Sequence, residues 1–219
     1  MNGPAELSLV HLVRPSVAAG PPPLLVLAHG YGSNEHDLFE LVSFLDPRLL
    51  VVSARAPYLL MPGSYAWFEI AFTNQGIVSD QRAATHSAEL LAQFVAEAAA
   101  AYGADPQRIM LGGFSQGASM AAIVALSRPD LIAAAAVLSG LVPAEITDIM
   151  PAAEHIAGRR FFVAHGTQDG VVPISNGRAI RRMLESLPVE LTYREYAMAH
   201  TISPECLADL RTWLHTQIE

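Results

Sequence analysis

The sequence predicts an α/β protein, in which a mostly parallel central sheet is covered by helices on both faces. Two observations lead to this prediction. Short, wholly apolar segments such as Leu24 to Ala28 recur along the chain, and strands that are apolar at every position are typical of parallel sheets buried on both faces. Longer segments with helical spacing of apolar residues separate them, which is the pattern of alternating strands and helices.

The expected elements follow one another in a regular order. Strands are expected near residues 7–13, 24–28, 50–54, 109–112, 133–139, 161–164 and 189–196. Helices are expected near residues 34–45, 80–102, 116–126, 175–185 and 204–218. In open sheets of this kind ligands bind beyond the carboxyl ends of the strands, so the loops after the strands are where we expect the chemistry.

The whole chain, residues 1–219, is expected to form a single domain. Its length is within the ordinary range of one domain, and Pro21-Pro22-Pro23 is too short to link two domains. No membrane span is expected, because the longest wholly apolar run, Leu131 to Leu138, is far below the roughly 18 residues that a span requires.

The composition excludes several classes of function. Thirteen basic residues against 21 acidic ones give a net charge of −8, so nucleic acid is not an expected partner. Every basic residue is Arg, which excludes a lysine Schiff base and the lysine of a phosphate-binding P-loop. Cys206 is the single cysteine, so neither a disulfide nor a multi-cysteine zinc site is expected, and we predict no metal and no cofactor. Residues 1–10 lack the order of a secretory signal, which favours a cytoplasmic protein.

The strongest local motif is Gly113-Phe114-Ser115-Gln116-Gly117, which lies directly between a predicted strand and a predicted helix. This G-x-S-x-G pattern is typical of a sharp turn that projects a nucleophilic serine above a sheet, where bulky residues on either side would collide with neighbouring chain. A glycine-rich structural turn would have the same small residues. The strand–turn–helix context favours Ser115 as a catalytic nucleophile.

A serine nucleophile requires a histidine base, and the base requires an acid that orients it. Asp169 follows a predicted strand by five residues and His200 follows the next one by four, and the chain order Ser, Asp, His is the one expected in this kind of fold. We therefore predict that Ser115, Asp169 and His200 form a catalytic triad. Asp148 is an alternative acid, and His165 is an alternative base that we interpret as a structural turn residue.

An oxyanion hole needs two backbone N–H groups directed at the developing negative charge. Gln116, which follows the predicted nucleophile, is expected to supply one of them. Tyr31, in the loop Gly30-Tyr31-Gly32, is expected to supply the other, because the flanking glycines permit close approach of the backbone. The same loop lacks the third glycine of a dinucleotide-binding fingerprint.

These motifs together resemble the phospholipase/carboxylesterase family of small α/β-hydrolases, which includes carboxylesterases, lysophospholipases and acyl-protein thioesterases. The stretch Ser33 to Asp37 is closer to the bacterial esterases than to the eukaryotic thioesterases of that family. The resemblance implies the α/β-hydrolase fold and a serine hydrolase with the triad and oxyanion donors named above. It is carried by these stretches, in order along the chain: Ala28 to Gly32, Arg55-Ala56-Pro57, Trp67-Phe68-Glu69, Gly112 to Gly117, His165 to Pro173, and His200 to Leu214.

The predicted activity is cleavage of carboxylic esters, with thioesters and lysophospholipid esters as further candidates, through an acyl-enzyme intermediate. The partner is a small-molecule ester with an apolar acyl group. The alternatives are a non-catalytic ligand-binding protein of the same fold, and a serine peptidase or lactonase with the same triad. The apolar surface from Tyr58 to Met61 serves either the substrate or a homodimer. The acyl pocket is expected to be lined by Tyr58, Leu59, Met61, Trp67, Phe68, Leu141, Val142, Val171 and Val172.

Overall fold

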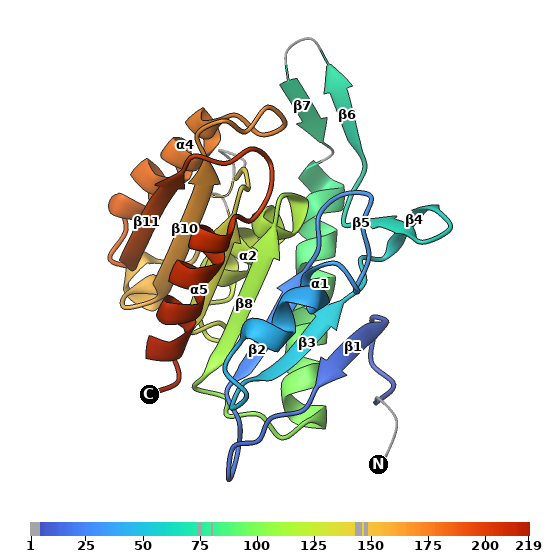
Figure 1. Ribbon diagram of the computed structural model, residues 1–219, viewed down its shortest axis with the longest axis vertical. Helices are drawn as coiled ribbons and strands as arrows, with labels where there is room; N and C mark the ends of the chain where they lie inside the picture. The colour runs from blue at the N-terminus through green and yellow to red at the C-terminus, as the bar shows by residue number, and fades with distance from the viewer. Residues whose placement is uncertain (1–4, 74–75, 80, 143–145, 147–148) are drawn as a thin grey trace.

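In the part of the chain that the structure describes, seven strands form the central sheet (Figure 1). The computed structural model describes residues 5–73, 76–79, 81–142, 146 and 149–219, and it describes residues 71–73, 76–79 and 81 by their backbone alone. The strands are, in their order across the sheet, β1 (His11–Arg14), β3 (Leu50–Ala54), β2 (Leu24–Ala28), β8 (Ile109–Phe114), β9 (Ala134–Leu138), β10 (Arg160–Gly166) and β11 (Glu190–Tyr196).

The sheet is parallel except at one edge, as the sequence predicts. Strand β1 pairs antiparallel with β3, and every other neighbouring pair is parallel. The strand ends are in register, since Ala28 pairs with Gly113 and Phe114 pairs with Leu138. The carboxyl ends of the parallel strands therefore lie along one edge of the sheet, which is the upper end in Figure 1.

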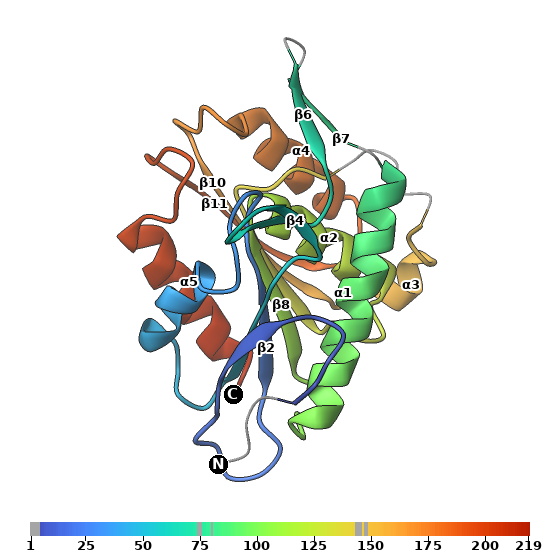
Figure 2. The ribbon, with the colours of Figure 1, turned by 90° about the vertical axis from the view of Figure 1, so that its right-hand side faces the viewer.

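Helices cover both faces of the sheet (Figure 2). Residues of α1 (Gln81–Ala101), α2 (Gln116–Ser127), α3 (Ala153–Ile156) and α4 (Ile174–Glu185) pack against one face, and residues of η1 (Leu38–Phe44) and α5 (Pro204–Thr216) pack against the other. Strand β2 shows why helices are needed on both faces of the sheet. Leu24 and Val26 contribute to the first apolar cluster and Leu25 and Leu27 to the second, because successive side chains of a strand point to opposite faces.

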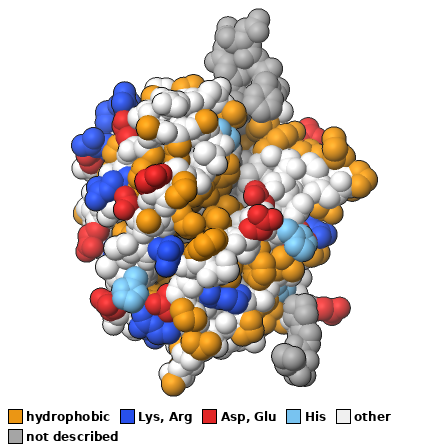
Figure 3. Space-filling model, viewed as in Figure 1, with side chains coloured by type: hydrophobic (Ala, Val, Ile, Leu, Met, Phe, Trp, Pro, Cys, Tyr) orange, Lys and Arg blue, Asp and Glu red, His pale blue; other side chains and the backbone are white. Residues whose placement is uncertain are grey.

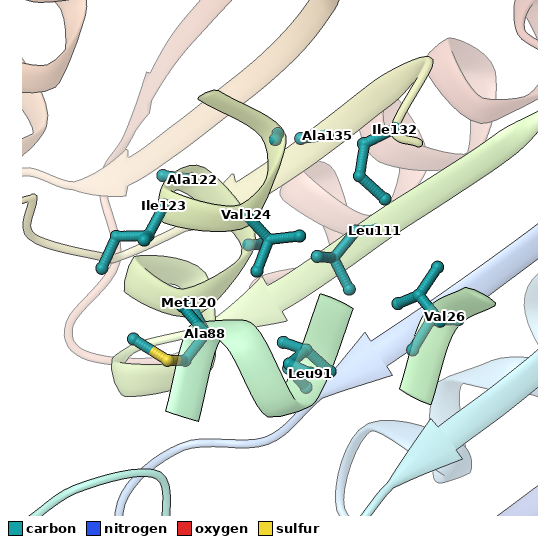
Figure 4. Close-up of a cluster of buried hydrophobic side chains, with 14 of the residues drawn as sticks. Val26, Ala88, Leu91, Leu111, Met120, Ala122, Ile123, Val124, Ile132 and Ala135 are labelled. Atoms are coloured by element: carbon teal, nitrogen blue, oxygen red, sulfur yellow. The ribbon is translucent and has the colours of Figure 1, made fainter. Parts of the chain in front are cut away.

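The core under α1 and α2 fixes the position of the nucleophile turn (Figure 4). Val26 and Leu111 of the sheet pack in one cluster with Leu91 of α1 and with Met120 and Val124 of α2. Every residue of α2 from Gln116 to Leu126 is buried, as expected of a helix that is apolar on all sides. The amino-terminal end of α2 is thus held rigidly at the end of β8.

The segment between β3 and α1 differs from what the sequence predicts. It forms two antiparallel hairpins, in which β4 (Tyr58–Met61) pairs with β5 (Ser64–Ala66) and β6 (Ile70–Thr73) pairs with β7 (Gly76–Ser79). No strand is predicted here from the sequence. The β4–β5 hairpin projects from the body of the protein and exposes hydrophobic side chains at its tip (Figure 3).

The helix predicted over residues 34–45 is also wrong in type and in extent, because the structure has the short 3-10 helix η1 there. Side chains before it hydrogen-bond to local groups, with Asn34 accepting from the N–H of His36 and Ser33 donating to Asp37. Asn, Asp and Ser compete with helical hydrogen bonds in this way. None of the described helices is long and apolar enough to cross a membrane.

Candidate active site

The turn between β8 and α2 is too crowded for any side chain at its two glycines. A Cβ atom on Gly113 would lie 2.2 Å from the carbonyl oxygen of Gly117, and one on Gly117 would lie 2.0 Å from the carbonyl oxygen of Ala28. Ser115, between them, has a φ of 54°, which is a strained conformation for a residue other than glycine. The predicted collision of bulky residues at this turn is confirmed.

Three side chains that are far apart in the sequence form one hydrogen-bonded chain above the sheet. The Nε2 atom of His200 lies 2.9 Å from the Oγ atom of Ser115, and its Nδ1 atom lies 2.7 Å from the Oδ2 atom of Asp169. The ring of Phe114 packs against the imidazole of His200, with the ring centroids 4.7 Å apart. The structure therefore brings Ser115, His200 and Asp169 together, with the imidazole between the hydroxyl and the carboxylate.

Asp169 is held by its own loop after β10. Its Oδ1 atom accepts hydrogen bonds from the N–H groups of Val171, at 2.9 Å, and Val172, at 2.8 Å. The residue is buried, and the other carboxylate oxygen faces His200. A carboxylate that accepts backbone N–H bonds on one oxygen and an imidazole N–H on the other is well placed to orient that imidazole.

The two alternatives have different outcomes. Asp148, the alternative acid, lies outside the described residues. His165, the alternative base, is fully buried at the end of β10, and its Nε2 atom lies 2.8 Å from the carbonyl oxygen of Val172. The position beside the Ser115 hydroxyl is occupied by His200 instead.

The loop that carries Tyr31 is fixed by hydrogen bonds to its neighbours. The ring of His29 lies 2.7 Å from the carbonyl oxygen of Gly30 and accepts from the N–H of Ala56, and burial lowers the pKa of this imidazole. The N–H of Gly32 donates to the carbonyl of Tyr65. Since Tyr31 lines the same cavity as Ser115, the backbone on both sides of the predicted oxyanion donor is held in place.

A partly buried ion pair, which the sequence analysis misses, links this loop to the residue after β3. Glu35 accepts from Arg55 at 2.6 Å and 2.5 Å. Its side chain is 3% exposed and that of Arg55 is 30% exposed. The hydrogen bonds from Arg55 lower the pKa of Glu35, and the carboxylate in turn raises the pKa of Arg55. Arg55 also lies over the ring of Tyr65, so the pair ties the Tyr31 loop to β5.

The side chain of Gln116 has a structural role in addition to the predicted role of its backbone. Its Oε1 atom accepts from the N–H of Trp67 at 2.9 Å, and its Nε2 atom donates to the carbonyl of Phe68 at 2.7 Å. The first residue of a helix also has an N–H group with no partner inside that helix. Gln116 thus joins the nucleophile turn to the wall of the cavity beside it.

A cavity of about 160 Å³ lies in front of Ser115 and His200. Its lining is mainly apolar and includes four of the predicted pocket residues, Phe68, Leu141, Val171 and Val172. The remaining lining residues are Tyr31, Ile70, Ser115, Gln116, Ser119 and His200.

The other five predicted pocket residues do not line this cavity. Trp67 is fully buried behind the wall, where its indole N–H donates to the carbonyl of His29. Tyr58, Leu59 and Met61 lie exposed on the β4–β5 hairpin, and Val142 packs against the hydrophobic core. The described residues contain no group of three or more metal-ligating side chains that could hold a metal ion.

The parallel sheet, the crowded turn after β8 and the layers of helices define an α/β-hydrolase. Residues 15–218 match the model of the phospholipase/carboxylesterase family, so the chain belongs to that family and is a hydrolase. The chain is 27% identical over 217 residues to acyl-protein thioesterase 1 of Emericella nidulans, and the match covers 87% of this chain and 88% of that protein.

Solved structures agree with this assignment. The structure of esterase PE8 is 27% identical, with a TM-score of 0.79, and the match covers 98% of this chain and all of that one. A carboxylesterase from Mesorhizobium loti is 24% identical, with a TM-score of 0.82 over 96% of each chain, and shares the fold. The resemblance stated from sequence motifs is therefore confirmed at the level of family and fold.

Proposed function

We propose that this protein hydrolyses carboxylic esters through an acyl-enzyme intermediate formed on Ser115. The single observation that supports this most strongly is the hydrogen-bonded chain from Ser115 through His200 to Asp169. A binding protein has no need of such an arrangement, whereas nucleophilic catalysis by a serine depends on it. Membership of a family of esterases supports the same reaction.

In the proposed mechanism, the Oγ atom of Ser115 attacks the ester carbonyl while Nε2 of His200 removes its proton. The same proton then passes to the oxygen of the departing alcohol, and water repeats the sequence to release the acid. Asp169 holds the imidazole in the tautomer with hydrogen on Nδ1. The backbone N–H groups of Tyr31 and Gln116 stabilise the oxyanion, each by about 2.7–4 kcal/mol.

The size of the cavity supports a substrate with a small apolar acyl group. Its volume, about 160 Å³, is close to that of an engineered cavity of about 150 Å³ that binds benzene. Thioesters and lysophospholipid esters would use the same machinery, and the relative from Emericella nidulans is named a thioesterase. A peptidase or lactonase would also use it, but the apolar lining beside Ser115 favours esters of short fatty acids.

Replacement of the nucleophile tests this proposal. Ser115→Ala is expected to lower kcat on p-nitrophenyl butyrate by about 10⁴- to 10⁶-fold, because it removes the hydroxyl that lies beside Nε2 of His200. A fluorophosphonate probe should label the wild-type protein and not the variant. Ser127→Ala, at the far end of α2, is the matched control and should retain activity. Wild-type turnover by Ser115→Ala, or no labelling of the native protein, would favour a non-catalytic ligand-binding protein.

Replacement of the acid separates Asp169 from its alternative. Asp169→Asn is expected to lower kcat by about 10⁴-fold, because an amide cannot hold His200 in the required tautomer. Asp148→Asn, measured beside it, should have little effect. A larger loss in Asp148→Asn would make Asp148 the acid.

The single domain, the cytoplasmic location and the homodimer stay predictions.

A further inference from the structure

His165 is a buried histidine that the proposed reaction does not use. It is next to the last residue of β10 and has no exposed surface. Its Nε2 atom lies 2.8 Å from the carbonyl oxygen of Val172 and 3.6 Å from the Oδ2 atom of Asp169. The ring therefore lies beside the loop that carries the predicted acid.

The contact with Val172 closes that loop. Asp169 accepts from the N–H groups of Val171 and Val172, and the carbonyl of the same Val172 faces His165. Because a carbonyl oxygen only accepts hydrogen bonds, Nε2 of His165 must carry the hydrogen. Both contacts meet at Val172, whose N–H donates to the carboxylate and whose carbonyl accepts from an imidazole that comes from the sheet.

The imidazole of His165 has little freedom to turn. A Cβ atom on Gly177 of α4 would lie 2.7 Å from Nδ1 and 2.8 Å from Cγ of the ring, so the ring packs directly on this backbone. Its Nδ1 atom is buried and has no hydrogen-bond partner among the described residues. The bond to Val172 is therefore the polar contact that accounts for a histidine at this buried position.

We propose that His165 is a positioning residue for Asp169. It acts through the Val172 carbonyl, holds the carboxylate at hydrogen-bond distance from His200, and neither touches the substrate nor transfers a proton. The inference rests on the proposed triad. A displacement of catalytic groups by about 1 Å can cost about 100-fold in rate, so loss of this support should appear in kcat rather than in substrate binding.

Three substitutions that differ in reach test this role. The side-chain amide nitrogen introduced by His165→Gln reaches about as far as Nε2 of the histidine. The amide nitrogen introduced by His165→Asn falls short of that position, and His165→Leu has no donor. We expect His165→Asn and His165→Leu to lower kcat by about 10- to 100-fold with KM unchanged, and His165→Gln to restore kcat to within a few-fold of the wild type. Equal losses in all three variants, or wild-type kcat in His165→Leu, would overturn the proposal.

A spectroscopic measurement separates positioning from general stability. The proton on Nδ1 of His200, bonded to Asp169, should give a downfield NMR resonance that persists in His165→Gln and is lost in His165→Leu. The control is His11→Leu, because His11 is also buried and hydrogen-bonded, to the carbonyl of Leu9 and the hydroxyl of Tyr102. It should lower Tm and leave both kcat and the resonance unchanged. A lower Tm in His165→Leu with an unchanged resonance would show that His165 has a structural role and does not position Asp169.

Two further measurements remain decisive if the His165 variants do not fold. Nitrogen NMR of the wild-type protein should show hydrogen on Nε2 of His165, and hydrogen on Nδ1 alone would overturn the proposal. Gly177→Ala should displace the ring and lower kcat while His165 itself is retained, and unchanged kcat would contradict the proposed role. Failure of the triad itself is recognised separately, since an active Ser115→Ala would refute the proposed function whatever His165 does.

Discussion

The nucleophile turn and the β4–β5 hairpin contain glycines for opposite physical reasons. At Gly117 a Cβ atom would lie 2.0 Å from a backbone oxygen, whereas at Gly63, in the hairpin, it would meet nothing within 4 Å. Gly63 has a φ of 81°, which glycine adopts readily, so glycine is needed there for the conformation of the turn. The first site is determined by packing and the second by the backbone alone.

The same contrast holds for the side chains of the two regions. Every residue from Gln116 to Leu126 is buried, whereas Leu59 and Met61 of the hairpin are 62% and 63% exposed. The predicted catalytic groups come directly after β8 or in the loops that follow β10 and β11. The hairpin is held at its base, where Tyr65 and Ser33 form a β-bridge. Substitutions at the turn should therefore affect both stability and activity, and substitutions of the exposed side chains at the hairpin tip should affect neither.

The largest effect is expected from Gly117→Ala. The added methyl group cannot fit against the carbonyl of Ala28 unless β2 or α2 moves, so we expect a loss of about 3 kcal/mol or more in stability together with most of the activity. For a protein of this size such a loss lowers Tm by about 6–12 °C. Gly63→Ala is the matched control, with a loss of about 1 kcal/mol and full activity. Equal Tm values for the two variants would contradict the proposed difference between the regions.

The sequence predicts the crowded region far better than the hairpins. Strands 24–28 and 50–54 are predicted with the bounds that the structure has, because side chains buried on both faces leave a continuous apolar run. The turn at Ser115 is predicted because crowding restricts it to small residues. Both signals are local, and each results from a constraint that acts on consecutive residues.

The hairpins and the cavity wall depend on contacts between distant residues, which no local pattern contains. Trp67 is an aromatic residue in an apolar stretch, and its sequence alone favours a pocket as much as a core. Its burial follows from bonds to His29 and Gln116, which lie 38 and 49 residues away. Glu35 is likewise predicted only as a carboxylate in a loop, because the sequence does not show that Arg55 lies beside it.

A smaller effect is expected at the ion pair between Glu35 and Arg55. Glu35→Gln leaves the guanidinium of Arg55 without its charged partner, and we expect a loss of about 2 kcal/mol in the free energy of unfolding at pH 7. This is less than the roughly 3–5 kcal/mol for a fully buried pair, because Arg55 is 30% exposed. Urea unfolding measures it, and the exposed Glu40→Gln should change stability by no more than about 0.5 kcal/mol.

The pH dependence of that loss has a definite sign. Arg55 lowers the pKa of Glu35 below its ordinary value of 4.5 in the folded protein, so the unfolded chain binds a proton first as the pH falls. The stabilisation is therefore complete above the unfolded pKa and is lost as the pH falls through the folded value. The difference between wild type and Glu35→Gln should be constant near neutral pH and shrink below about pH 4.5. A difference that grows towards acid pH would show that Glu35 is not held as a carboxylate.

The smallest effect is expected at the hairpin tip. The double variant Leu59→Ser, Met61→Ser removes two side chains that contact mainly solvent, so the free energy of unfolding should change by no more than about 0.5 kcal/mol and kcat/KM on p-nitrophenyl butyrate should not change. Phe68→Ala, in the same segment but 5% exposed and lining the cavity, should lose about 3 kcal/mol and raise KM. A shift in elution volume on size exclusion for the double variant would indicate that the tip contacts a second copy of the chain. A rise in KM for the double variant without a shift in elution volume would return Leu59 and Met61 to the substrate site, because a change in association between copies of the chain would then not explain it.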